Sequence, residues 1–236
     1  MTSPYTLRHV DVDRIGRVWL REGTSDQAVL DQILFSEEFN ISTAPQFSWI
    51  EAAYEAQLAA GETPLIVDCG ANIGLSCLYF AKHLPKARII GIEPAADNVE
   101  IARMNTAQYP MIEIIAAAVN DTAAPLRIAN PDAEKFAYRT EEGSGAGLTV
   151  PGVTIPDLMA RHGALRCLIV KVDIEGAELQ LFRSNTGWLD GTGLLIAETH
   201  DWLFPGQGTS RTLFKALEGR SFEVNQRGEY ISFFFC

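Results

Sequence analysis

The segment Val67-Asp68-Cys69-Gly70-Ala71-Asn72-Ile73-Gly74 decides the fold of this chain. It continues a short apolar run from Leu65 and precedes the amphipathic stretch Leu75–His83, so it predicts a buried strand, a glycine turn and a helix. Gly70 and Gly74 bracket the turn, and glycine lets the backbone approach a ligand without a Cβ in the way. Ligands of doubly wound sheets bind at the carboxyl ends of the strands, so this turn is the predicted binding loop.

Apolar strands and amphipathic helices alternate on the C-terminal side of this loop. Strands are expected at Leu65–Asp68, Ala87–Glu93, Met111–Val119, Cys167–Asp173 and Leu194–Thr199, and helices at Leu75–His83, Ala96–Tyr109, Ala177–Phe182 and Ser210–Leu217. This order predicts an α/β fold with a doubly wound, mostly parallel sheet. The segments Phe222–Val224 and Tyr230–Phe235, on either side of Gly228, predict a C-terminal antiparallel hairpin.

The domain organisation follows from where this alternation begins. Residues 1–62 are expected to form a small N-terminal cap of strands and helices packed on the core, with strands near Leu7–Val10 and Arg17–Arg21, a helix starting near Asp26 and another at Phe47–Ala60. Residues 63–236 form the main domain. Within it, the turn-rich stretch at about 120–153 is predicted to be a β-hairpin insertion carrying a mobile loop.

Composition narrows the classes of partner. The 236 residues include 30 acidic and 19 basic side chains, for a net charge of −11, and this balance argues against nucleic acid as a partner. No apolar run is long enough to span a membrane, and the N-terminus lacks the pattern of a secretory signal. The four cysteines form no CxxC pair, which favours free thiols in the cytoplasm. We therefore expect a cytoplasmic protein with a small-molecule partner, and a homo-oligomer remains open.

An acid at the end of the second strand identifies the class of cofactor. Glu93 is placed to accept hydrogen bonds from both hydroxyls of a ribose. A dinucleotide site would require G-x-G-x-x-G, whereas this chain has Gly70-x-x-x-Gly74 with Asp68 before it. The Asp68 carboxylate would repel a pyrophosphate and attract the cationic amino-acid end of S-adenosylmethionine. S-adenosylmethionine is therefore the predicted cofactor, with Asn72 as a further contact. A nucleotide-linked oxidoreductase and a non-catalytic cofactor-binding subunit remain alternatives.

Two further walls of the site are predicted from position alone. The adenine is expected at the end of the third strand, where the small residue Ala118 leaves room for the ring and Asn120 lies within reach of its amino group. Trp202 and Phe204 follow the fifth strand, and they are the expected aromatic wall of an acceptor pocket.

Four motifs give the chain a resemblance to a known family, the FkbM-type methyltransferases. They are Arg21-Glu22-Gly23-Thr24-Ser25-Asp26, the glycine loop with Glu93-Pro94, Val170-Lys171-Val172-Asp173-Ile174-Glu175-Gly176-Ala177-Glu178, and Ala197-Glu198-Thr199-His200. The resemblance implies a Rossmann-like class I methyltransferase fold and methylation of a hydroxyl oxygen on a sugar, polyketide or other small metabolite. The chain departs from the family's pattern at Pro156, which separates Thr154-Ile155 from Asp157, and at Phe39, where the family often has a tyrosine.

Methyl transfer to a hydroxyl requires an aligned acceptor and a group that removes its proton. Lys171, Asp173 and Glu175 gather at the end of the fourth strand, with Lys171 and Asp173 on the same side of it. Glu198 and His200 share a side at the end of the fifth strand, and the ordinary pKa of His200 suits a general base. These five residues are the catalytic candidates. A structural ion pair is the alternative role for Lys171. No metal is predicted, although a divalent cation held by Asp173, Glu198 and His200 is the alternative to a general base.

Overall fold

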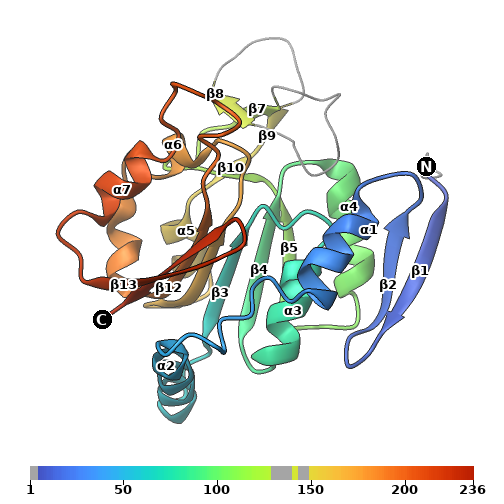
Figure 1. Ribbon diagram of the computed structural model, residues 1–236, viewed down its shortest axis with the longest axis horizontal. Helices are drawn as coiled ribbons and strands as arrows, with labels where there is room; N and C mark the ends of the chain where they lie inside the picture. The colour runs from blue at the N-terminus through green and yellow to red at the C-terminus, as the bar shows by residue number, and fades with distance from the viewer. Residues whose placement is uncertain (1–4, 129–139, 143–148) are drawn as a thin grey trace.

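The computed structural model describes residues 5–128, 140–142 and 149–236 (Figure 1). A seven-stranded sheet runs through the molecule in the order β13-β14-β12-β11-β3-β4-β5. The strands are β3 (Leu65–Cys69), β4 (Arg88–Glu93), β5 (Ile112–Ala116), β11 (Cys167–Val172), β12 (Thr192–Glu198), β13 (Phe222–Arg227) and β14 (Tyr230–Phe235). The strands from β12 to β5 are parallel, and β14 and β13 add an antiparallel hairpin. The predicted fold class is therefore confirmed.

Helices cover both faces of this sheet (Figure 1). They are α3 (Leu75–His83) and α4 (Ala96–Thr106) on one face, and α5 (Ile155–Arg161), α6 (Glu178–Leu181), α7 (Arg211–Leu217) and a 3-10 helix at Thr186–Gly191 on the other. Side chains alternate along each strand, so that Ile66 packs toward α3 and Val67 toward the opposite layer. Both faces are apolar, as expected of parallel strands buried on two sides.

The N-terminal residues pack on the α3 face of the sheet. They form the hairpin β1 (Leu7–Val12) and β2 (Gly16–Arg21), helix α1 (Asp26–Leu30) with a π-helical turn at Asp31–Phe35, and helix α2 (Phe47–Ala59). Leu20, Leu30 and Ile50 belong to the same buried cluster as Ile66 of the central strand. This segment therefore packs on the sheet and shares its buried core.

The stretch predicted as a β-hairpin insertion contains more strands than one hairpin. After β5 the chain continues as β6 (Ala118–Val119), which pairs in parallel with β10 (Gly152–Val153). Between them, β7 (Leu126–Ile128) pairs with both β8 (Thr140–Glu142) and β9 (Thr149–Val150). The predicted single strand Met111–Val119 is thus divided between two sheets. The predicted mobile loop falls on residues 129–139 and 143–148, outside the described residues.

Helix α5 was not predicted, although the sequence carries its start signal. The Thr154 hydroxyl accepts a hydrogen bond from the Asp157 backbone N–H at 3.1 Å and donates one to Asp157 Oδ2 at 2.7 Å. Pro156 lies in the first turn, where its missing N–H costs no helical hydrogen bond. Thr154 therefore caps the helix, and Asp157, whose position departs from the family pattern, lies in its first turn and binds the capping hydroxyl.

No helix among the described residues has the length and apolar character needed to cross a bilayer. Cys69, Cys77, Cys167 and Cys236 are all free thiols.

Candidate active site

A cavity of about 300 Å³ opens at the carboxyl ends of β3, β4, β11 and β12. Nine of the twelve residues predicted for the site line it: Gly70, Asn72, Glu93, Ala118, Lys171, Asp173, Glu175, Glu198 and His200. The structure thus brings the predicted cofactor residues and catalytic residues to one cavity. Asp68, Gly74 and Asn120 are not part of its lining.

The glycine loop approaches β4 and β11 closely. The backbone N–H groups of Gly70 and Ala71 both donate to the Ile92 carbonyl at 3.0 Å. Gly70 has a φ of +84°, and a Cβ placed on it would lie 1.8 Å from the Asp173 carbonyl oxygen. Gly74, also at +84°, precedes α3 and packs against α4 rather than the cavity. The close approach at Gly70 therefore excludes any side chain at this position.

Gly70→Ala is expected to destabilise the protein by about 2–3 kcal/mol, because a strained left-handed backbone is combined with a backbone clash. Gly61→Ala is a matched control, since Gly61 has a φ of +76° with nothing within 4 Å of the added Cβ. That control should show only the conformational cost of about 1 kcal/mol. Urea unfolding followed by circular dichroism compares the two, and equal losses would show that the Asp173 contact is relaxed at no cost.

Glu93 lies at the end of β4 with its carboxylate held by the surrounding backbone. Oε2 accepts from the Asn72 N–H at 2.9 Å, and Oε1 accepts from the Ala95 N–H at 2.9 Å and from Asn98 Nδ2 at 3.4 Å. Burial raises the pKa of Glu93 to about 7, although these hydrogen bonds oppose the shift. The carboxylate is therefore oriented at the cavity wall and sensitive to charge and hydrogen bonding there.

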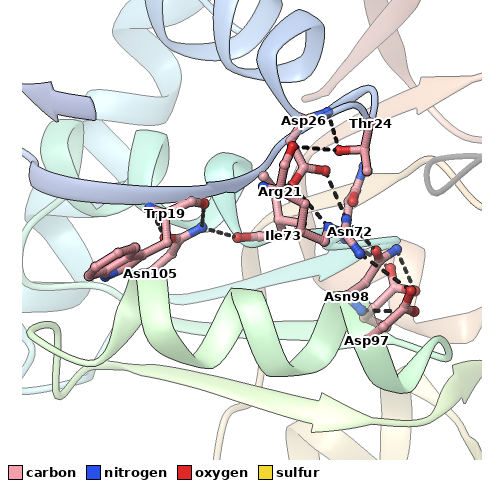
Figure 2. A network of polar contacts seen from close by, with 10 residues as sticks. Trp19, Arg21, Thr24, Asp26, Asn72, Ile73, Asp97, Asn98 and Asn105 are labelled. Carbon is pink, nitrogen blue, oxygen red and sulfur yellow. Dashed lines mark hydrogen bonds and ion pairs between the residues drawn. The ribbon is translucent and has the colours of Figure 1, made fainter. Parts of the chain in front are cut away.

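The motif Arg21–Asp26 connects the N-terminal segment to Asn98, as Figure 2 shows, and Asn98 in turn donates to Glu93. Arg21, 2% exposed, donates from Nε and Nη2 to both oxygens of Asp26 at 3.0 and 2.8 Å. The same Nη2 donates to Asn98 Oδ1 at 2.8 Å. Burial opposes the charge on Arg21, but Asp26 outweighs this effect and raises the pKa of Arg21. This network holds α1 in place as a wall of the cavity, where Ser25 contributes to the lining.

A second contact in Figure 2 fixes the edge of the N-terminal hairpin. The Trp19 N–H donates to Asn105 Oδ1 at 2.6 Å, and Asn105 Nδ2 donates to the Ile73 carbonyl at 2.9 Å. The Asn105 side chain on α4 thus connects β2 directly to the glycine loop. Sequence reasoning missed Arg21, Asn98 and Asn105 as supports of the site, and only the Arg21–Asp26 motif carried a signal for them.

Lys171 lies beneath the cavity between two carboxylates. It stands opposite Asp68 in the register of β11 and β3, and its Nζ is 3.3 Å from Asp68 Oδ1 and 3.3 Å from Asp173 Oδ2. It also donates to the Gly70 carbonyl at 2.9 Å. Burial opposes the charge on Lys171, but the two acids outweigh burial and raise its pKa. Lys171 therefore connects the glycine loop to the end of β11.

Asp68 is turned away from the cavity. Its Oδ2 accepts a short hydrogen bond from the Ser76 hydroxyl and contacts the Cys77 thiol at 3.2 Å, while Oδ1 faces Lys171. The side chain is fully buried. The charge of Asp68 is directed at Lys171, and the contact between Asp68 and the cationic end of a cofactor stays a prediction. Asp68 acts on the loop through Lys171 and Gly70.

His200 is the centre of a cluster of acids. Its Nδ1 lies 2.8 Å from Glu178 Oε1, and its Nε2 lies 3.4 Å from Glu198 Oε1, 3.6 Å from Glu175 Oε2 and 3.8 Å from Asp173 Oδ1. Burial opposes the charge on the ring, but the hydrogen bond to Glu178 and the other acids raise the pKa of His200 to about 9. The acids thus favour the protonated form of the ring when no ligand is bound, and the role of His200 as a general base stays a prediction.

The acids around His200 differ in their environments. Burial, followed by repulsion from Asp173, raises the pKa of Glu175 to about 7 and that of Glu198 to about 8. Burial also opposes the charge on Asp173, but Lys171 and His200 outweigh this effect and lower its pKa. Asp173 Oδ2 further accepts a hydrogen bond from the Tyr230 hydroxyl at 2.9 Å. Asp173 is thus the acid most firmly held in its ionised form.

Two residues at the cavity have unusual backbone conformations. Asn72 has a φ of 48° and Glu175 a φ of 55°, which is uncommon for residues other than glycine and often marks functional sites. Gly176, at +95°, follows Glu175 and packs against the Phe204 ring. This left-handed turn directs the chain so that the Glu175 side chain lines the cavity.

The two predicted acceptor-wall aromatics separate in the structure. Trp202 lines the cavity and is 66% exposed at its mouth, with its ring centroid 6.2 Å from that of His200. Phe204 is not in the lining and packs on Gly176. Of these two aromatic residues, Trp202 is the one that lines the cavity.

At the predicted adenine end of the cavity, Ala118 and Val119 form the wall. Asn120 follows them, buried, and neither its Oδ1 nor its Nδ2 has a hydrogen-bond partner among the described residues; the same holds for Asn72 Oδ1. Buried polar atoms are normally paired, so these atoms retain unused hydrogen-bonding capacity among the described residues. Asp121 is held by Arg183 at 2.9 Å and by the Ser184 hydroxyl at 2.7 Å.

A parallel sheet with a glycine turn after β3, an acid at the end of β4 and a cavity at the strand ends defines a class I methyltransferase fold. The model of the "Methyltransferase FkbM domain" matches residues 68–204. The chain therefore belongs to the FkbM methyltransferase family.

Individual relatives of known name share only part of this sequence with it. A methyltransferase from Sordaria araneosa, sdnD, is 26% identical over 154 residues, covering 51% of this chain and 60% of sdnD. The AMB antimetabolite synthetase AmbE of Pseudomonas aeruginosa is 36% identical over 58 residues, covering 24% of this chain and 3% of AmbE. The matches thus span less than two thirds of these relatives. Among solved structures, a precorrin-6y C5,15-methyltransferase from Geobacter metallireducens is similar with a TM-score of 0.43 and 12% identity, covering 78% of this chain and 87% of that one.

Proposed function

We propose that this chain transfers a methyl group from S-adenosylmethionine to a hydroxyl oxygen of a small-molecule acceptor, such as a sugar, a polyketide or another secondary metabolite. The observation that carries the proposal is the single cavity in which Asn72 and Glu93 adjoin Asp173, Glu198 and His200. One side of this cavity suits a nucleoside and the other suits removal of a proton.

The residues present fit S-adenosylmethionine. Glu93 presents a carboxylate able to accept hydrogen bonds from ribose hydroxyls, and Gly70 leaves room for close approach because it has no side chain. The unpaired amide atoms of Asn72 and Asn120 offer polar contacts. Ala118 provides the small wall next to Asn120. These residues would hold the cofactor, with Gly74 and Asp68 supporting the loop from behind.

When bound, the cofactor supplies a methyl group on a cationic sulfur, and attack by a nucleophile leaves the electron pair of the C–S bond on that sulfur. The chain's own residues align the acceptor and take up its proton. Trp202 at the mouth offers a flat apolar surface to the acceptor. Asp173, Glu175 and Glu198 face the interior of the cavity, where they favour positive charge and accept the proton that the hydroxyl loses.

The test combines binding and transfer. Calorimetry with S-adenosylmethionine and S-adenosylhomocysteine should show one site per chain, and transfer of a tritiated methyl group should occur to members of a panel of sugars, hydroxylated polyketides and phenols. Failure of both cofactors to bind folded protein would contradict the proposal. Binding of NAD in their place would favour the oxidoreductase alternative, and binding without any transfer the non-catalytic one.

Cofactor affinity is expected to fall as the pH decreases from 8 to 6. The pKa of Glu93 is about 7, and only its ionised form accepts hydrogen bonds from two ribose hydroxyls. Protonation therefore competes with binding and weakens it by up to about tenfold per pH unit below that pKa. Calorimetry with S-adenosylhomocysteine measures this trend.

Glu93→Gln is the control for this pH dependence. It should bind more weakly at pH 8 and should lose the part of the pH dependence that Glu93 contributes. A variant with the same slope as the unchanged protein would show that another group, such as Glu175, controls the titration.

A further inference from the structure

We propose that Asp173, Glu175, Glu198 and His200 form a binding site for a divalent cation, with Mn²⁺ as the best-matched ion. Asp173, Glu175 and His200 each offer one ligand atom, and these atoms lie within 4.8 Å of one another. Glu198 Oε1 adds a fourth atom 3.4 Å from the same histidine nitrogen. The four residues come from the end of β11, the turn after it and the end of β12.

The histidine is the first reason to assign an ion to this cluster. His200 is 1% exposed, and its Nδ1 is fixed by Glu178 Oε1 at 2.8 Å. Glu178 is itself held, because the same oxygen accepts from the Gly176 N–H at 3.3 Å. A carboxylate on the far nitrogen is the usual way in which a metal-binding histidine is oriented. The ring is therefore locked with Nε2 directed at three carboxylates.

The carboxylates also present free oxygens toward the same point. Asp173 uses Oδ2 for Tyr230 at 2.9 Å and Lys171 at 3.3 Å, so Oδ1 is the oxygen that faces His200 Nε2. Glu175 reaches the cluster through a left-handed backbone position. Each acid thus contributes one oxygen to one region of the cavity, as a cation site requires.

Negative charge is in excess around His200. Asp173, Glu175 and Glu198 converge on His200 Nε2, while a fourth acid, Glu178, holds the other ring nitrogen. Lys171 is shared between Asp173 and Asp68. Like charges at these distances repel strongly in a partly buried site, and a divalent cation bound by the facing oxygens and Nε2 would offset that repulsion.

The types of ligand atom in the cluster indicate which divalent cation would fit it. Carboxylate oxygens suit Mg²⁺, Ca²⁺ and Mn²⁺, whereas imidazole suits transition metals, and Mn²⁺ accepts both. A bound cation would lower the pKa of an acceptor hydroxyl placed against it. This catalytic role rests on the proposed function, but binding of the ion does not.

The test uses the 236-residue chain stripped with EDTA, with neither cofactor nor acceptor present. Titration with MnCl₂, followed by calorimetry and by the loss of the free Mn²⁺ signal in electron paramagnetic resonance, should show one ion per chain. Glu175→Gln and His200→Ala should weaken binding at least about tenfold, and Glu178→Gln about 10–100-fold through the histidine orientation. Competition with Mg²⁺, Ca²⁺ and Zn²⁺ ranks the ions.

Glu229→Gln is the matched control, because Glu229 lines the same cavity but lies outside the cluster. It removes the same charge and should leave Mn²⁺ affinity close to that of the unchanged protein. The proposal is overturned if the unchanged protein binds no Mn²⁺, or if Glu175→Gln binds it equally well. If His200→Ala does not fold, the half-buried Glu175 decides the outcome.

Binding of S-adenosylhomocysteine to the same samples separates this proposal from the proposed function. Cofactor binding without Mn²⁺ binding overturns the cation site alone. Mn²⁺ binding without cofactor binding supports the cation site and contradicts the proposed function. The alternative occupant of the cluster is the amine of a cationic acceptor. If an amine binds to the cluster and Mn²⁺ does not displace it, the proposal is also overturned.

Discussion

Lys171→Met is expected to destabilise the protein by about 3–5 kcal/mol, as is typical when one partner of a buried ion pair is removed. The substitution leaves Asp68 fully buried without its cation and deprives Asp173 of its closest one. It also removes the hydrogen bond to the Gly70 carbonyl. Urea unfolding monitored by circular dichroism measures the loss.

A double variant identifies the origin of this effect. Adding Asp68→Asn to Lys171→Met removes the stranded charge and should recover part of the lost stability, because replacing both partners costs less than replacing one. A loss below about 1 kcal/mol for Lys171→Met, or no recovery in the double variant, would show that Lys171 does not neutralise these acids.

The strand and helix order was predictable because the pattern is local. The expected helix Leu75–His83 has the observed bounds of α3, and the strand expected to start at Leu65 is β3. Both are marked by short-range signals, a buried apolar run and a glycine turn, which do not depend on partners far along the chain. The C-terminal hairpin was predictable for the same reason, since Gly228 turns the chain between two apolar-rich segments.

The N-terminal residues were less predictable because their partners are distant. Phe39 stacks near Phe80 and Tyr230 and lies 5.8 Å from Lys171 Nζ. In the sequence, Phe39 appeared only as the absence of a tyrosine. No periodicity within residues 1–62 indicates that this ring completes the core beside the buried Lys171, because the contact depends on tertiary packing.

The site was predictable at the level of strand ends but not of single contacts. Alternation predicted that Lys171 and Asp173 would share one side of their strand, and Glu198 and His200 one side of theirs, since side chains two residues apart share a face. The partner of Asp173, Tyr230, was missed because it depends on the register of β14 against β12. The direction of Asp68 was equally hidden, because it follows from the pairing of β3 with β11.

Asp173→Asn is expected to lower kcat by about 10²–10⁴-fold while leaving cofactor affinity within a few-fold of the unchanged protein. Asp173 is the acid of the cluster whose pKa is lowered, with Lys171 as its main stabilising charge. Asparagine keeps the shape and the hydrogen-bond acceptor for Tyr230 but loses the negative charge that faces the acceptor. Initial rates with the acceptor that the panel identifies, and calorimetry with S-adenosylhomocysteine, separate kcat from binding.

Tyr230→Phe is the comparison that isolates charge from position. It removes the hydrogen bond to Asp173 Oδ2 and keeps the carboxylate ionised beside Lys171. Its effect on kcat should therefore be much smaller than that of Asp173→Asn, because Lys171 still orients the acid. If the two variants lose activity equally, Asp173 contributes through its position and not its charge. If Asp173→Asn keeps full activity, proton removal does not depend on Asp173. Glu175 and Glu198 then become the groups to test.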